Sequence, residues 1–131
     1  MDDVFELYRS AERLLAKGDV REAVRNLERA AELEPESTAV RRLLARAYFK
    51  SAALSRSEEA ARSVVDRDPA DAETMHLLGR CLTRQGRSDE AGRWLRLAAA
   101  MDPRPEYASE VEITDDSSQF EFDIELTDPP R

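Results

Sequence analysis

The chain contains, at residues 72–105, the stretch AETMHLLGRCLTRQGRSDEAGRWLRLAAAMDPRP. Its apolar residues recur at intervals of three and four, which is the spacing of amphipathic helices. Gly86 interrupts this pattern near its middle, and Pro103 follows its last apolar residues. Because proline cannot supply the N–H that a continuing helix needs, the stretch predicts two helices joined by a short turn.

The same arrangement occurs three times along the chain. Pro35, Pro69 and Pro103 each follow an acidic residue directly, and each lies 34 residues from the next. A fixed period of this length is typical of stacked helical repeats, since one helix pair cannot bury its apolar side alone. A coiled coil is the structural alternative, but glycine or proline breaks in every half repeat argue against it. The predicted three repeats and tail are residues 4–37, 38–71, 72–105 and 106–131.

Short polar motifs mark the predicted helix starts. An Asp or Ser followed three residues later by Glu forms a capping box, in which each side chain accepts a hydrogen bond from a free backbone N–H. The three pairs of this kind are Asp3 with Glu6, Asp19 with Glu22, and Ser55 with Glu58. Gly18 and Gly86 are expected to adopt the left-handed backbone conformation that ends a helix.

The repeat resembles the tetratricopeptide repeat (TPR), whose signature is W-x2-L-G-x2-Y, then A-x3-F, A and P. The third repeat matches with Met75 in the Trp place, Leu78, Gly79, Leu82, Ala91, Leu95, Ala98 and Pro103. The first matches with Leu7, Ala11, Leu14, Ala23, Leu27, Ala30 and Pro35. The second matches with Leu44, Ala45, Tyr48, Ser57, Ala61, Val64 and Pro69. The departures are Ser10 in a Leu place and Arg41 in the Trp place. The resemblance implies an all-α fold, a right-handed α-solenoid of three helix–turn–helix units, whose role is to bind other proteins.

In TPR stacks, by this resemblance, the first helix of each repeat lines a concave groove. The first-helix residues outside the core are then the predicted partner-binding residues. They are Phe5, Tyr8, Arg9, Glu12, Arg42, Leu43, Arg46, Phe49, Lys50, Glu73, His76, Leu77, Arg80 and Arg84. Six are basic, two are acidic and three are aromatic. This mixture suits an acidic peptide with bulky apolar side chains, because arginine pairs with carboxylates in a fork geometry.

Other interpretations of these residues remain open. Charged side chains are common on any solvated helix face, and Phe5 has a second interpretation as a cap on the N-terminal core. The basic pairs at equivalent repeat positions, Arg46 with Arg80 and Lys50 with Arg84, favour a basic stripe.

The chaperone-tail clamp of the family is not expected here. Some TPR proteins grip the C-terminal carboxylate of chaperone tails through lysine, asparagine and arginine. The matching places hold Tyr8, Glu12, Leu43, Glu73 and Leu77. None of these residues is of a clamp type, so we expect a different mode of binding.

The tail differs from the repeats in charge. Residues 1–105 hold 19 acidic and 19 basic side chains, whereas residues 106–131 hold nine acidic side chains and Arg131. Apolar and acidic residues alternate in the last part of the tail, a pattern typical of an extended segment. Its apolar residues are Phe120, Phe122, Ile124 and Leu126. We expect either a disordered acidic tail or a segment docked on the basic groove as a cap or competitor. A β-hairpin across Asp115–Ser118 is disfavoured, since it would place like charges opposite each other.

We expect no enzyme activity, metal site or cofactor. His76 and Cys81 are the single histidine and cysteine, and they lie on different sides of one predicted helix. The neutral repeats and the acidic tail disfavour nucleic acid, which requires a basic excess. No apolar run approaches the roughly 20 residues that span a membrane, and the N-terminus lacks a signal-peptide pattern. A cytoplasmic location is therefore expected.

The leading functional hypothesis is an adaptor that binds a protein or peptide partner in its groove. The alternative is a self-associating structural module in which tails exchange between copies. The sequence carries no sign of the partner's identity.

Overall fold

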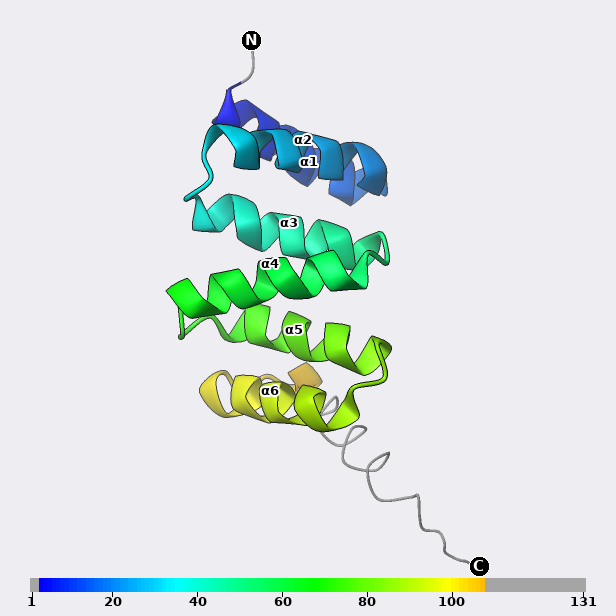
Figure 1. The fold of residues 1–131 in the computed structure, drawn as a ribbon, viewed down its shortest axis with the longest axis vertical. Coiled ribbons are helices and arrows are strands. Elements are labelled where there is room, and N and C mark those ends of the chain that lie inside the picture. Colours follow the sequence, from blue (N-terminus) through cyan, green and yellow to red (C-terminus); the bar gives the residue numbers. More distant parts are fainter. Residues whose placement is uncertain (1–2, 108–131) are drawn as a thin grey trace, which may run out of the picture. The chain divides into compact units, whose positions relative to one another are not determined.

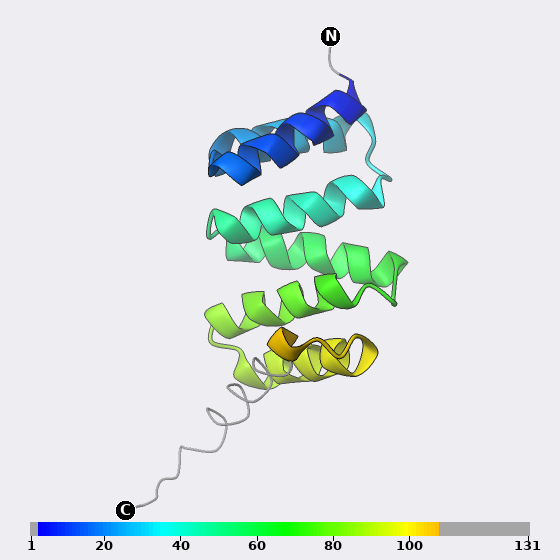
Figure 2. The same ribbon diagram turned by 180° about the vertical axis from the view of Figure 1, so that it is seen from behind.

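The computed structural model describes residues 3–107 and shows an all-helical chain over that range. Its helices are α1 (Val4–Lys17), α2 (Val20–Leu33), α3 (Thr38–Lys50), α4 (Leu54–Arg67), α5 (Ala72–Arg84) and α6 (Ser88–Met101). Figures 1 and 2 show from opposite sides that α1 and α2, α3 and α4, and α5 and α6 each form a hairpin with a short turn. The predicted all-α chain of three helix hairpins is therefore confirmed in the described residues.

The chain divides into two compact units between Asp68 and Pro69. In the first unit α1 packs on α2, α2 on α3, and α3 on α4. In the second unit α5 packs on α6. None of these helices is long and apolar enough to cross a membrane.

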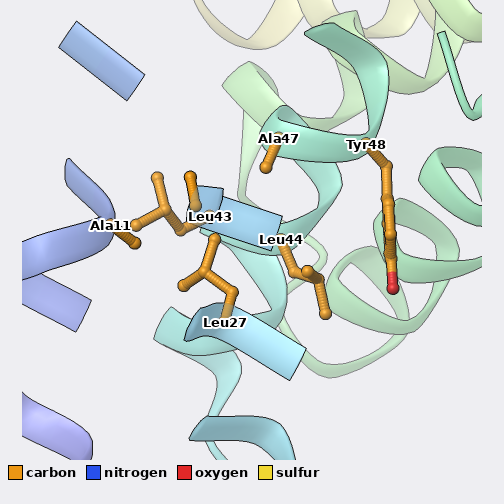
Figure 3. Packing of buried hydrophobic residues seen from close by; sticks show 7 residues of the cluster. Ala11, Leu27, Leu43, Leu44, Ala47 and Tyr48 are labelled. Carbon is orange, nitrogen blue, oxygen red and sulfur yellow. The ribbon is translucent and has the colours of Figure 1, made fainter. Parts of the chain in front are cut away.

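The core of the first unit combines small and large apolar side chains from three helices. Ala11, Ala23 and Ala47 are fully buried, and the larger Leu27 is fully buried in the same cluster. Figure 3 shows Leu43 and Leu44 of α3 in the same cluster. Burial of such side chains is the main force that holds helix pairs together.

The core of the second unit depends on a close approach of α5 to α6. Gly79 is buried at this crossing, and Leu95 is fully buried there. A Cβ atom on Gly79 would lie 2.6 Å from Cγ and Cδ2 of Leu95, which is too close for two carbon atoms. Glycine is therefore the residue that lets Leu95 fill this crossing.

The helix ends agree in part with the predicted signals. Asp3 caps α1 by accepting a hydrogen bond from the Phe5 N–H at 3.1 Å. Asp19 precedes α2, but its side chain makes no capping hydrogen bond. The prediction for Ser55 is wrong, because α4 already begins at Leu54 and Ser55 lies inside the helix.

Three residues spaced by the repeat period turn the chain from first to second helix. Gly18 and Gly86 have φ values of 89° and 80°, which confirms their predicted left-handed conformation. Ala52 takes the same place in the second hairpin with φ of 64°. In all three hairpins the second helix begins two residues after this left-handed residue, so α4 begins at Leu54 and already includes Ser55.

The folded part of the chain extends beyond the predicted tail boundary at residue 106. Tyr107 is only 3% exposed, and its ring stacks on His76 of α5 with a centroid distance of 4.2 Å. The second residue of the predicted tail segment 106–131 is thus packed against the second unit, and the boundary itself stays a prediction. The predicted tail ligand residues Phe120, Phe122, Ile124 and Leu126 lie outside the described residues.

Candidate functional site

The first unit presents most of its predicted partner-binding residues to solvent. Phe5 is 64% exposed, Arg9, Arg46 and Lys50 are exposed, and Tyr8 is half-buried. Arg42 is half-buried as well.

Two predicted groove residues are not available to a partner. Leu43 is 3% exposed and belongs to the hydrophobic cluster with Ala11 and Leu27. Phe49 is 9% exposed. Both predictions are corrected: these apolar side chains turn into the interior, where burial removes them from water.

A cleft of about 800 Å³ opens where α1 begins, α2 ends and α3 begins. It brings the predicted residues Phe5 and Tyr8 together with residues from the turn between α2 and α3. Its lining is Asp3, Val4, Phe5, Tyr8, Leu33, Glu34, Ser37, Ala39 and Val40. Exposed apolar side chains are concentrated here, since Leu33 is 40% exposed beside the even more exposed Phe5.

Side-chain caps hold two of the three helix ends that shape this cleft. Asp3 caps α1, and the Ser37 hydroxyl accepts a hydrogen bond from the Val40 N–H at 3.2 Å at the start of α3. Leu33, Glu34 and Ala39 were not among the predicted groove residues. Leu33 and Glu34 lie at the end of a second helix, whereas the predicted groove residues were all taken from first helices. The signal for them was their place beside Pro35, where the chain passes from one repeat to the next.

Basic side chains continue from the cleft along one face of α3. Ala39 lines the cleft, and Arg42, Arg46 and Lys50 follow it at intervals of three and four residues. Residues at this spacing lie on the same side of a helix. We call Arg42, Arg46 and Lys50 the basic row. Arg42 lies 3.8 Å from the Asp68 carboxylate, whereas Arg46 and Lys50 are exposed.

Arg9 of α1 lies beside Phe5 but is not part of the cleft lining. Its guanidinium lies 5.5 Å from the centre of the Phe5 ring, within the range of a cation–π contact. It also lies 3.9 Å from Glu12, and both side chains of this pair are about half exposed to solvent. Such an exposed pair contributes little to stability, so Arg9 is available to reorient toward a ligand.

In the second unit the chain itself covers one of the predicted residues. His76 stacks against Tyr107 with an interplanar angle of 21°. Arg104 lies 5.3 Å from the Tyr107 ring centre and pairs with Asp102 at 2.8 Å. Burial raises the pKa of the Tyr107 hydroxyl above its ordinary value. The other predicted residues of α5 are Leu77, which is half-buried, and Glu73, Arg80 and Arg84, which are exposed.

Among residues 3–107, no three His, Cys, Asp or Glu side chains are close enough to hold a metal ion. Cys81 is fully buried in α5. Arg46 belongs to the first unit and Arg80 to the second, so a basic stripe that joins them stays a prediction.

The family model of the tetratricopeptide repeat matches residues 14–73 and residues 52–109, which together make up most of the chain. The chain belongs to the tetratricopeptide repeat family. This confirms the resemblance drawn from the proline period and the signature residues. No curated protein matches the sequence.

Solved structures of TPR proteins share the fold. The first TPR domain of Spaghetti (RPAP3), bound to the HSP90 peptide SRMEEVD, is 15% identical with a TM-score of 0.83. The similarity covers 88% of this chain and 92% of that one. MamA from Desulfovibrio magneticus RS-1 is 20% identical with a TM-score of 0.86, over 89% of this chain and 67% of that one. At these identities the likeness shows the fold alone.

Proposed function

We propose that this TPR protein is an adaptor that binds an extended peptide segment of a partner along α1 and α3. The observation that carries the proposal is the continuity of an apolar cleft with the basic row on α3. The cleft offers room for an apolar side chain. Arg46 and Lys50 offer charges for carboxylates that follow it.

The fold neighbours support peptide binding as a class of function. The Spaghetti domain was solved with a bound peptide, and that peptide carries two glutamates and an aspartate. The places of the carboxylate clamp in the present chain include Leu43, which is buried, and Tyr8, which lines the cleft. An acidic partner is therefore proposed to bind through the basic row rather than through a clamp.

The acidic tail is proposed to compete for the same site. Its segment 120–126 alternates apolar and acidic residues, and its carboxylates are the groups that the basic row would attract. A tether that allowed the tail to reach this site would supply an effective concentration on the order of millimolar, so even a weak site would be occupied.

Charge reversal on α3 tests the proposed function. The probe is a labelled peptide with the sequence of residues 118–128, SQFEFDIELTD, titrated into the full chain by fluorescence anisotropy. The double variant Arg46→Glu with Lys50→Glu is expected to weaken binding by about tenfold or more, because both attractive charges become repulsive. Arg21→Glu with Arg25→Glu is the matched control, since this exposed pair has the same spacing on α2.

Equal losses in both double variants would show a nonspecific charge effect and refute the proposed site. Light scattering on the full chain separates the adaptor from the self-associating module. A mass of one chain supports the adaptor, whereas a concentration-dependent mass that falls when the tail is removed supports tail exchange.

A further inference from the structure

The cleft of the first unit has a counterpart in the second unit, two repeat periods further along the chain. Shifting each lining residue by 68 positions gives its counterpart. Five of these pairs are Asp3 and Asp71, Tyr8 and His76, Leu33 and Met101, Glu34 and Asp102, and Ala39 and Tyr107. Asp3 and Asp71 both cap their helices through the side chain, so the local framework of the two places is alike.

The two places differ in what fills them. In the second unit the Tyr107 ring is buried and stacks on His76 at 4.2 Å. In the first unit the corresponding residue is the exposed Ala39, whose methyl group leaves an open cleft of about 800 Å³ beside Tyr8. The open cleft of the first unit therefore corresponds to the position that the Tyr107 ring fills in the second unit.

The charges around the two places differ as well. In the second unit Arg104, three residues before Tyr107, lies over the tyrosine ring. It pairs with Asp102, which lies five residues before the tyrosine. In the first unit the place of Arg104 is taken by Glu36, which forms an ion pair with Arg67. The lining of the open cleft thus carries the carboxylates Asp3 and Glu34 without the arginine that accompanies the aromatic ring in the second unit.

We propose that the first-unit cleft binds an aromatic side chain of a partner polypeptide that carries an arginine or lysine three residues before it. The aromatic ring stacks on Tyr8 as Tyr107 stacks on His76, and the cation pairs with Glu34 as Arg104 pairs with Asp102. This inference rests on the proposed function and names the anchor by which the partner is held.

The chain's own tail is a poor match for this anchor. Three residues before Phe120 and Phe122 stand Ser117 and Gln119, which carry no charge. Glu121 and Asp123 flank these phenylalanines and would be repelled by Asp3 and Glu34. The partner therefore has an advantage over the tail at the cleft, whereas the tail competes along the basic row.

Short peptides test the anchor on the full chain. The probe is acetyl-Arg-Pro-Glu-Tyr-amide, which copies residues 104–107, followed by amide chemical shifts in a ¹H–¹⁵N spectrum. We expect saturable shifts at Tyr8, Leu33 and Ala39. Replacing the peptide's tyrosine by alanine is expected to weaken binding by about tenfold, because the stacked ring is lost. Replacing its arginine by glutamate is expected to weaken it as well.

Two chain variants provide the matched controls. Ala39→Tyr is expected to fill the cleft from within and abolish the shifts while the circular dichroism spectrum stays helical. Glu34→Arg is expected to reverse the preference, so that the peptide with glutamate in place of arginine binds better. The second variant keeps the test valid if the first does not fold.

The inference is overturned if the tyrosine and alanine peptides give the same shifts, if no shifts appear at the cleft, or if Glu34→Arg leaves the preference unchanged. Binding of the 118–128 peptide distinguishes a failure of the aromatic anchor from a failure of the proposed adaptor function. If that peptide binds through the basic row while the tetrapeptide does not bind, the anchor is refuted and the adaptor stands. If neither peptide binds the full chain or a chain that ends at Tyr107, from which the competing tail is absent, both proposals fail.

Discussion

At the scale of single residues, polar side chains tie neighbouring helices of the first unit together. The Tyr48 hydroxyl of α3 donates a hydrogen bond to Oε2 of Glu28 on α2 at 2.5 Å. Arg56 of α4 lies 3.6 Å from the same carboxylate. Burial, together with the bond to Glu28, raises the pKa of Tyr48 to about 12. The phenol therefore holds its proton more tightly in the folded chain than in the unfolded one.

This pKa predicts a specific loss of stability in alkali. An unfolded tyrosine titrates near ~10, so the contribution of Tyr48 is complete below that pH and is lost as the pH rises toward about 12. We expect Tyr48→Phe to cost about 1–2 kcal/mol of unfolding free energy at pH 7, because the hydrogen bond to a charged acceptor is lost. The difference from the unsubstituted chain should shrink between pH 9 and pH 11, as measured by urea unfolding. A difference that stays constant over this range would contradict the raised pKa.

The backbone of Ala52 offers a second prediction at this scale. Its φ of 64° places a side chain in the left-handed region, where Gly18 and Gly86 stand in the other hairpins. Ala52→Gly is expected to stabilise the chain by about 0.5–1 kcal/mol in thermal unfolding, since relief of this strain exceeds the added chain entropy. Gly18→Ala is the matched reverse substitution and should destabilise by a similar amount. A loss of stability in Ala52→Gly would show that the turn is not strained.

At the scale of helices, the size of one residue sets how closely each pair packs. The crossing place in the first helices holds Ala11, Ala45 and Gly79, and the facing place in the second helices holds Leu27, Ala61 and Leu95. Alanine and leucine meet in the first hairpin, so that combination is compatible with the fold. The third hairpin instead combines glycine with leucine, which allows a closer contact.

Gly79→Ala is expected to destabilise the second unit by about 1–2 kcal/mol. The new methyl group would meet Leu95 at 2.6 Å, and the cost of moving the helices apart exceeds the gain of about 1 kcal/mol in helix propensity. Adding Leu95→Val should recover part of the loss, because it removes volume at the same crossing. Chemical unfolding of the single and double variants measures this coupling. Additive effects of the two substitutions would refute the steric argument.

At the scale of the whole molecule, charge and packing divide the chain at different places. The repeats to residue 105 are neutral by charge, while the acidic excess lies beyond them. Packing, however, continues to Tyr107, whose ring is part of the second unit. A chain shortened by charge alone would therefore lose a core residue.

Two truncated chains separate these effects. A chain that ends at Tyr107 is expected to keep its stability and to bind the 118–128 peptide more tightly than the full chain does, because the competing tail is gone. A chain that ends at Pro105 is expected to be less stable by about 2 kcal/mol, since it loses the buried ring. Unfolding curves and peptide titration measure the two outcomes. Unchanged affinity in the chain that ends at Tyr107 would contradict tail competition.

Much of the fold was predictable from local patterns in the sequence. Helices, their proline and glycine ends, the 34-residue period and the family all follow from residues close together in the chain. The exceptions among the helix ends were Asp19, whose side chain makes no capping bond, and Ser55, since the left-handed conformation of Ala52 has no glycine to signal it. The candidate site was predictable only in part, and Phe5 and Tyr8 are the predicted residues that line the cleft.

The sequence by itself therefore determined the helical repeat and the charge of each segment, because helix periodicity and turn residues act over a few neighbours. Only the tertiary structure decided that Leu43 and Phe49 are buried, that Tyr107 covers His76, and that a cleft opens beside Ala39. Each of these depends on contacts between helices or on the volume left between them. Such contacts join residues that are distant in the chain, and no short pattern records them.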